Sequence, residues 1–110
     1  MEIRCENKGE YLVAHLKGSL DMSAGGHLRR VEDLRSPQRD LILDLAEVDF
    51  MDSAGLGALV LVIRGHKSAG KRCLLAAPTP IVARTLKVTA IHQMAPVLTS
   101  VDQAIKSPVS

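Results

Sequence analysis

The sequence predicts a single α/β domain, residues 1–110, built on a mixed sheet of four to five strands packed with about four helices. Three observations support this fold class: the length suits one domain, strand-like and helix-like patterns alternate, and only a short turn separates the first two strand patterns. A short turn joins antiparallel strands, whereas a crossover through a helix places strands parallel. We therefore expect an antiparallel first pair followed by parallel strands.

Residues 1–7 and 11–20 are predicted to form the opening pair of strands, with the turn sequence Lys8-Gly9-Glu10 between them. In the second strand, alternate residues point to opposite faces of the sheet. One face carries Leu12, Ala14 and Leu16, and the other carries Tyr11, Val13 and His15.

Residues 23–34 are predicted to form one helix, because apolar residues recur there at helical spacing. That stripe consists of Ala24, Leu28, Val31 and Leu34. Gly25 and Gly26 weaken its first turn, and Ser36-Pro37 ends it. The continuous apolar run at 41–45 is typical of a strand that is covered on both faces.

A second helix is predicted to follow Ser53, with Leu56, Leu59, Val60 and Ile63 on one stripe and Gly70 as its carboxy-terminal cap. Leu61 and Val62 widen the stripe, so we expect this helix to be buried against the sheet with Ser53 exposed at its start.

The rest of the chain repeats the alternation of strands and helices. Residues 71–77 read as a strand, and Thr79-Pro80 as the N-cap and first position of a helix over 80–88. Residues 94–98 read as a short strand that Pro96 confines to the sheet edge. A capping-box pattern, Ser100 with Gln103, opens a last short helix.

The composition is that of an ordinary soluble globule, with 46% hydrophobic and 24% charged residues. No amino-terminal signal pattern is present, and no apolar run approaches the ~20 residues that span a bilayer. Cys5 and Cys73 are too few for a disulfide scaffold, which favours reduced, buried thiols in a cytoplasmic protein. A single disulfide between them stays open.

Charge and metal-ligand spacing point to no nucleic-acid, membrane or metal partner. The net charge is +2, and the two basic clusters, 27–30 and 64–72, read as solvated surface. No aromatic residues are interleaved with them to stack on bases, and no zinc spacing exists among the cysteines and histidines. We expect the four histidines at the surface or at helix ends.

The segment DFMDSAGLGALV, from Asp49 to Val60, introduces an apolar helix with an Asp-Ser pair. Ser53 could simply cap the helix by accepting a hydrogen bond from a free amide of the first turn. Alternatively, it is held out for chemistry. Gly55 and Gly57 fit the second reading, because they remove side chains that would obstruct a partner near the Ser53 hydroxyl.

This segment resembles the phosphorylation-site segment of bacterial anti-sigma factor antagonists, single-domain members of the STAS group. The resemblance extends to LKGSLDMSA, which places Gly18 and Asp21 at characteristic positions, and to the closing segment LKVTAIHQMAPVLTSVDQAI. It implies a STAS-like fold over the whole chain. Three departures affect the partner-facing surface. Ala54 stands where many members have a second hydroxyl residue, Ala90 replaces a usual glycine, and Gly25-Gly26 lies in a helix that relatives fill with better helix formers.

The resemblance implies a partner-switching role in transcription. In this family the unphosphorylated protein binds an anti-sigma factor, which is also a serine kinase, and so frees a sigma factor. Phosphorylation dissociates the complex, and a serine phosphatase reverses it. By this resemblance Ser53 is the phosphoacceptor, the protein is not an enzyme, and it carries no cofactor. The implied partner-binding residues are Asp21, Asp52, Ala54, Gly55, Leu56 and Gly57.

Some roles stay open. Asp21 could equally cap a helix or contact a partner. Asp52 is expected to shape the loop before the helix. Leu56 could pack into the core or lie at the rim of the site. A STAS adaptor subunit of a signalling or lipid-transport assembly is an alternative in which the serine is not modified. A serine hydrolase is disfavoured, because the motif is not Gly-x-Ser-x-Gly.

Overall fold

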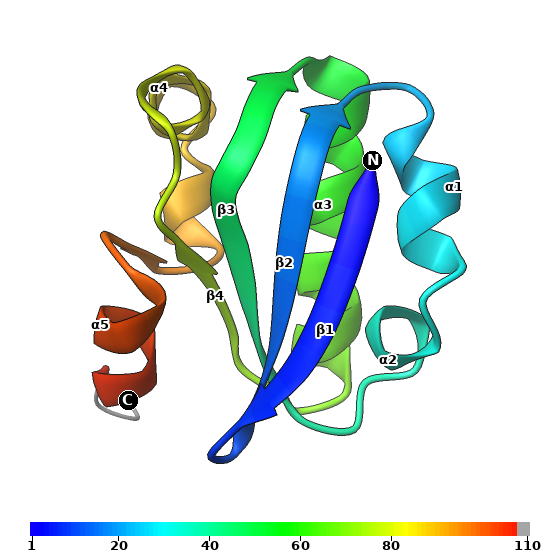
Figure 1. The fold of residues 1–110 in the computed structure, drawn as a ribbon, viewed down its shortest axis with the longest axis vertical. Helices are drawn as coiled ribbons and strands as arrows, with labels where there is room; N and C mark the ends of the chain where they lie inside the picture. Colours follow the sequence, from blue (N-terminus) through cyan, green and yellow to red (C-terminus); the bar gives the residue numbers. More distant parts are fainter. Residues whose placement is uncertain (108–110) are drawn as a thin grey trace.

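The fold is one five-stranded mixed sheet covered by helices (Figure 1), as seen in a computed structural model that describes residues 1–107. The strands lie in chain order across the sheet, and only the first pair is antiparallel. The strands are β1 (Glu2–Lys8), β2 (Tyr11–Leu20), β3 (Asp40–Met51), β4 (Cys73–Ala76) and β5 (Val97–Leu98). The predicted antiparallel first pair and parallel later strands are therefore confirmed.

The helices connect the parallel strands and close the chain. They are α1 (Ala24–Arg29), α2 (Glu32–Arg35), α3 (Ser53–Ser68), α4 (Pro80–Val88), the 3-10 helix η1 (Ile91–Gln93) and α5 (Val101–Lys106). Figure 1 shows α3 behind the strands and α5 beside β4. The short β5 lies at the edge of the sheet after Pro96, as expected.

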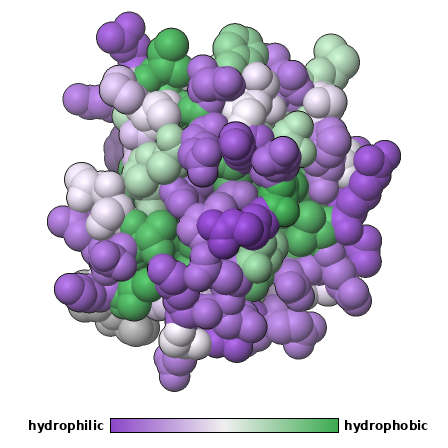
Figure 2. Space-filling view, viewed as in Figure 1, coloured by the Kyte–Doolittle hydropathy of each residue, from purple (hydrophilic) through white to green (hydrophobic). Residues whose placement is uncertain are grey.

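Two apolar cores follow from the alternation along β2. Its Leu12, Ala14 and Leu16 belong to the larger core, which includes residues of α1, α2, α3 and α4. Tyr11 and Val13 belong to a smaller core on the other face, which α5 covers through Ala104. Figure 2, in the same view as Figure 1, shows mainly hydrophilic side chains in the middle of this second face. The predicted assignment of faces is confirmed.

The predicted helix over 23–34 is wrong in one respect, because the chain forms two short helices there. Val31 lies between them with extended backbone angles, φ −87° and ψ 110°. The break still leaves Leu28 and Leu34 buried, so a single apolar stripe served two helices with a turn between them.

The third strand is much longer than the predicted run 41–45. It continues to Met51, pairing with β2 through two register shifts, and Val48 and Met51 are buried. Because α3 begins two residues after Met51, this extension sets where the helix starts. It thereby places Ser53 at the end of the sheet where β2 also ends.

Candidate functional site

Asp52, and not Ser53, caps α3. Asp52 has extended backbone angles, and its Oδ1 accepts a hydrogen bond of 2.9 Å from the Gly55 amide. Its own amide donates to the Leu20 carbonyl at 3.1 Å, which ties the helix start to the end of β2. The reading of Ser53 as the cap is therefore wrong, and the expectation that Asp52 shapes the loop is confirmed.

Ser53 is the first residue of α3 and is exposed, as predicted. Within residues 1–107 its hydroxyl has no hydrogen-bond partner. The amides of Ser53 and Ala54 also have no acceptor within the helix, because the first amides of any helix lack one. The hydroxyl is thus free to meet a reagent or a partner, and it stands where a helix favours negative charge.

Asp21 lies beside this site and organises the turn that leads into α1. Its Oδ1 accepts hydrogen bonds from the Ser23 hydroxyl at 2.7 Å and the Ser23 amide at 3.0 Å. Those bonds hold the pKa of the Asp21 carboxyl below its ordinary value, so the group is ionised at neutral pH. Asp21 follows Leu20, which contacts Asp52, so the two acidic residues flank the start of α3.

The remaining motif residues divide between the surface and the interior. Ala54 and Gly57 are exposed, and Leu56 is half-buried and packed against the larger core. Gly55 is buried, and a Cβ there would overlap the backbone of Leu20. The reason given for Gly55 from sequence is therefore wrong: its missing side chain lets α3 approach β2, and does not open the surface to a partner.

Two apolar side chains near Ser53 were not singled out from sequence. Met22, in the turn after β2, is 86% exposed, and Phe50, near the end of β3, is 47% exposed. Phe50 pairs in register with Ser19 of β2, so both apolar residues lie at the end of the sheet where α3 starts. Exposed apolar groups beside a free hydroxyl are typical of a protein-binding surface. We call Asp21, Met22, Phe50, Ser53 and Ala54 the Ser53 surface.

The strand pattern of the sequence does not indicate the exposure of Phe50. Alternation would place Phe50 on the same face as Val48, which is buried. The register shift between the pairs Gly18–Val48 and Ser19–Phe50 turns Phe50 to the outside, and the sequence carries no signal for that shift. An aromatic residue in a chain with so few is easily assigned to the core instead.

The histidines are placed differently from the expectation. His66, in α3, is only 1% exposed, and its Nδ1 lies 3.0 Å from the Val62 carbonyl oxygen. His15, in β2, is half-buried between Asp44 and Glu6, at 2.5 Å and 2.6 Å. This cross-strand cluster lies on the sheet face opposite α3, away from Ser53. His66 lies in the last turn of α3, at a helix end as predicted, although its side chain is buried, whereas His15 lies within a strand.

Metal-ligating groups, membrane-spanning helices and cysteines are further features that bear on function. Within residues 1–107 no group of three or more His, Cys, Asp and Glu side chains could hold a metal ion. No helix in that part of the chain has the length and hydropathy to cross a membrane. Both cysteines are free thiols, Cys73 buried and Cys5 half-buried, and burial raises the pKa of the Cys73 thiol to about 12.

The comparison with known families gives one match over nearly the whole chain. The model of the STAS domain family matches residues 2–104. That range contains every residue of the Ser53 surface.

Three solved proteins have a similar fold. An anti-sigma factor antagonist from Mycobacterium paratuberculosis is 20% identical, with a TM-score of 0.83 over 96% of this chain and 91% of that one. Unphosphorylated SpoIIAA, an anti-sigma factor antagonist, is 22% identical, with a TM-score of 0.75 over 99% of this chain and 100% of that one. The structure of phosphorylated SpoIIAA from Bacillus is 21% identical, with a TM-score of 0.69 over 96% of this chain and 97% of that one. The STAS domain of a SulP transporter from Vibrio cholerae is 25% identical, with a TM-score of 0.73 over 91% of this chain and 81% of that one.

Proposed function

The chain belongs to the STAS domain family, and from this premise we propose that it is an anti-sigma factor antagonist whose binding is switched off by phosphorylation of Ser53. Unphosphorylated, it binds an anti-sigma factor that is also a serine kinase, and a sigma factor is released. The kinase phosphorylates Ser53 and the complex dissociates, after which a serine phosphatase restores binding. The chain acts in the cytoplasm as ligand and substrate, without a cofactor of its own.

The observation that carries this proposal is the free Ser53 hydroxyl at the start of α3. The hydroxyl is exposed and unbonded, and a neighbouring residue supplies the cap that a helix start requires. A kinase can therefore reach the hydroxyl without disturbing the fold. No base of the described chain is hydrogen-bonded to it, which favours a substrate over a nucleophilic enzyme.

The same geometry supports a local switch. A phosphoryl group adds a charge of about −1.5 to −2 at neutral pH. It would stand between Asp21 and Asp52 and beside the exposed side chains of Met22 and Phe50. A partner packed on this surface would meet both repulsion and added bulk, whereas the helix start tolerates the new charge. Binding is lost without any refolding of the domain.

The test is phosphorylation by purified anti-sigma factor kinases of the source organism. We expect one of them to transfer phosphate from ATP to Ser53, located by mass spectrometry, and to bind the unphosphorylated chain more tightly than the phosphorylated one. Ser23, exposed in the turn before α1, is the internal control site that should stay unmodified. Phosphorylation at Ser23 alone, or equal affinity of both forms, would contradict the proposal.

A second candidate is an adaptor in which the fold binds a larger assembly and Ser53 is never modified. The observation that favours it is the similarity to the STAS domain of a SulP transporter, at 25% identity. An adaptor predicts that no kinase modifies Ser53 and that binding of its assembly is indifferent to Ser53→Asp. The phosphorylation experiment therefore separates the two functions.

A further inference from the structure

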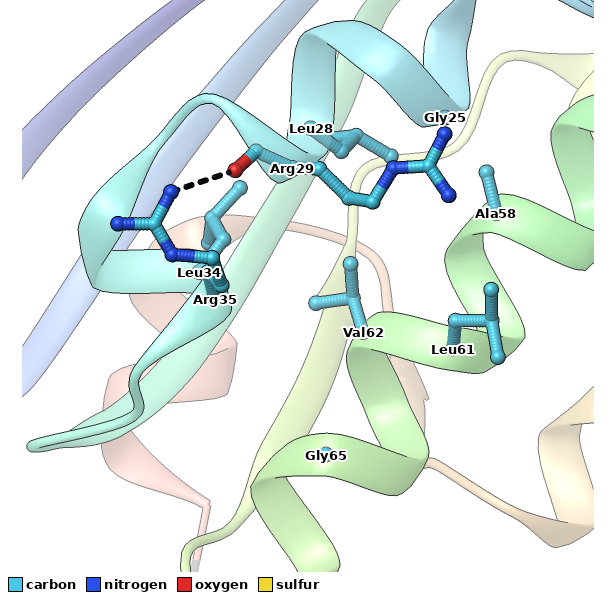
Figure 3. A pocket seen from close by; sticks show the side chains of 9 residues that line it. All are labelled: Gly25, Leu28, Arg29, Leu34, Arg35, Ala58, Leu61, Val62 and Gly65. Carbon is cyan, nitrogen blue, oxygen red and sulfur yellow. Dashed lines mark hydrogen bonds between the residues drawn. The ribbon is translucent and has the colours of Figure 1, made fainter.

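The packing of α1 and α2 on α3 leaves a groove of about 170 Å³, whose lining includes none of the residues of the Ser53 surface. Figure 3 shows the groove with side chains of all three helices around it. Its apolar lining comes from Leu28, Leu34, Ala58, Leu61 and Val62, and Gly25 and Gly65 also line it. On α3 the groove begins at Ala58, five residues after Ser53, or about 7.5 Å along the helix axis.

Leu61 gives the groove an apolar rim that no part of the described chain covers. The sequence predicts a helix that is apolar nearly all round, yet Leu61 is 64% exposed while Leu59 and Ile63 are fully buried. α3 therefore presents one large apolar side chain to solvent, and it stands beside the groove. A leucine projecting beside a hollow is typical of a surface that a partner covers.

Gly65 opens the groove where a side chain would fill it. A Cβ built on Gly65 meets no atom within 4 Å, so nothing in the packing of α3 requires glycine at this position. Glycine in a helix interior costs about 1 kcal/mol relative to alanine. Within the described chain, its visible effect is the open space at this end of the groove.

The rim of the groove is basic. Arg29 of α1 and Arg35 of α2 line it, and Arg64 precedes Gly65 on α3. Arg35 Nη1 donates to the carbonyl oxygen of Arg29 at 3.1 Å, and Figure 3 shows its guanidinium turned toward the end of α1. None of the three arginines forms an ion pair with another group of residues 1–107. Of these arginines, Arg29 and Arg35 line the apolar hollow itself, and Arg64 lies outside its lining.

We propose that this groove docks an acidic amphipathic helix of a protein partner, with one apolar side chain in the hollow and carboxylates on Arg29 and Arg35. A volume of about 170 Å³ is below the ~300 Å³ at which small-ligand pockets begin, and suits a single anchoring side chain. Arg29 and Arg35 form no ion pair within residues 1–107, so carboxylates close to that anchor would pair with them. Helix-in-groove recognition combines these two features.

Charge and shape favour a peptide over the other anionic partners. A membrane surface is bound by projecting apolar side chains, whereas here the apolar surface is mostly concave. Single-stranded nucleic acid needs aromatic platforms, and no aromatic residue lines the groove. The proposal stands on these observations alone, and does not depend on whether Ser53 is modified.

The test is a selection from a displayed library of helical peptides with one randomised face, using the full chain as bait. We expect the enriched peptides to share a leucine, methionine or phenylalanine with aspartate or glutamate about one turn away on each side. Gly65→Met should fill the groove, and Arg29→Glu with Arg35→Glu should reverse its charge. Each should weaken binding of an enriched peptide at least about tenfold.

Two controls make the outcome decisive. Arg84→Glu reverses an exposed charge on α4, far from the groove, and should leave peptide affinity unchanged. Ser53→Asp should also leave it unchanged. The proposal is overturned if no peptide is enriched, if the enriched peptides lack acidic residues, or if Gly65→Met binds them as the wild type does. Binding of phosphatidylglycerol vesicles or dodecanoate at this groove, in place of peptides, would overturn it as well.

Discussion

Among the glycines, Gly55 is the one whose surroundings leave the least space for a side chain. A Cβ at this position would overlap the carbonyl group of Leu20, and backbone atoms cannot move aside as a flexible side chain can. We therefore expect Gly55→Ala to push α3 away from β2 and to lower the free energy of unfolding by about 3 kcal/mol or more. Chemical denaturation followed by circular dichroism measures this loss.

Gly57 is the matched control, two residues further along the same helix. A Cβ there meets no atom within 4 Å, so Gly57→Ala should raise stability by up to about 1 kcal/mol through helix propensity. If both alanine variants are equally stable, the close contact between Gly55 and β2 does not exist in solution.

His66 makes stability depend on pH. Burial lowers the pKa of its imidazole below the ordinary value of 6.5, an effect that Asp40 and the hydrogen bond to Val62 only partly offset. Between the folded and the unfolded pKa, the unfolded chain binds a proton that the folded chain does not. Stability from this group is therefore fully present above pH 6.5 and is lost as pH falls from that value through the lower pKa of the folded state.

The variant His66→Gln should remove this part of the acid sensitivity. Melting temperatures measured from neutral pH to about pH 5 should fall less steeply for the variant than for wild type. His92→Gln, at an exposed position in η1, is the control and should follow the wild-type curve. Parallel curves for His66→Gln and wild type would show that His66 is not the titrating group.

At the scale of single residues, the sequence left ambiguities that only packing resolves. Asp52 and Ser53 are both good capping residues, and the register of β3 on β2 decides that Asp52 takes the cap. Thr79 stands at the expected N-cap position of α4, but its hydroxyl donates to the Val48 carbonyl at 3.0 Å instead. The local sequence pattern predicts where a helix starts, whereas tertiary contacts determine which side chain forms the capping hydrogen bond.

The start of α3 is the element on which the site depends. Asp52→Ala removes the hydrogen bond to the Gly55 amide and should cost about 1 kcal/mol of unfolding free energy. Asp52→Asn keeps an acceptor without the charge, so it should lose much less. Denaturation of both variants checks this, and equal losses would assign the effect to the carboxylate charge rather than to the cap.

The ends of helices and strands were predicted well where a residue with a specific terminating role, such as a capping glycine, marks them. Gly70, with φ +75°, ends α3 in a Schellman motif: its amide bonds the Lys67 carbonyl, and the Lys71 amide bonds the His66 carbonyl. No comparable residue marks the break between α1 and α2, and the apolar spacing runs straight through Val31. The extension of β3 was missed because exposed Ala46 and Glu47 interrupt its apolar pattern.

At the scale of the whole molecule, the described fold offers no phosphate cradle, and we predict that the isolated chain does not bind ATP appreciably. The glycines of the Ser53 motif belong to α3 or pack on β2, and no lysine follows them as in a phosphate-binding loop. Isothermal titration calorimetry with Mg-ATP should detect no saturable binding. Tight stoichiometric binding would mean that the chain, and not its partner, supplies the nucleotide.

The last prediction concerns the proposed switch, which would act at the surface because Ser53 is exposed. Because Asp52 and not Ser53 is the cap, Ser53→Ala should melt like wild type, bind the anti-sigma kinase in the presence of ADP, and resist phosphorylation. Ser53→Asp should also fold, since a helix start tolerates the carboxylate. Its charge beside Asp21 and Asp52 should weaken kinase binding by about 1–3 kcal/mol.

The control for charge alone is Ser36→Asp, at an exposed position between α2 and β3, which should bind as tightly as wild type. Affinity for the kinase and thermal melting are measured for all four proteins. A loss confined to Ser53→Asp, with unchanged melting, places the switch in the interface, because the domain itself then has one folded state. If wild type, alanine and aspartate forms bind equally while all are folded, Ser53 is no switch, and the adaptor role becomes the better account.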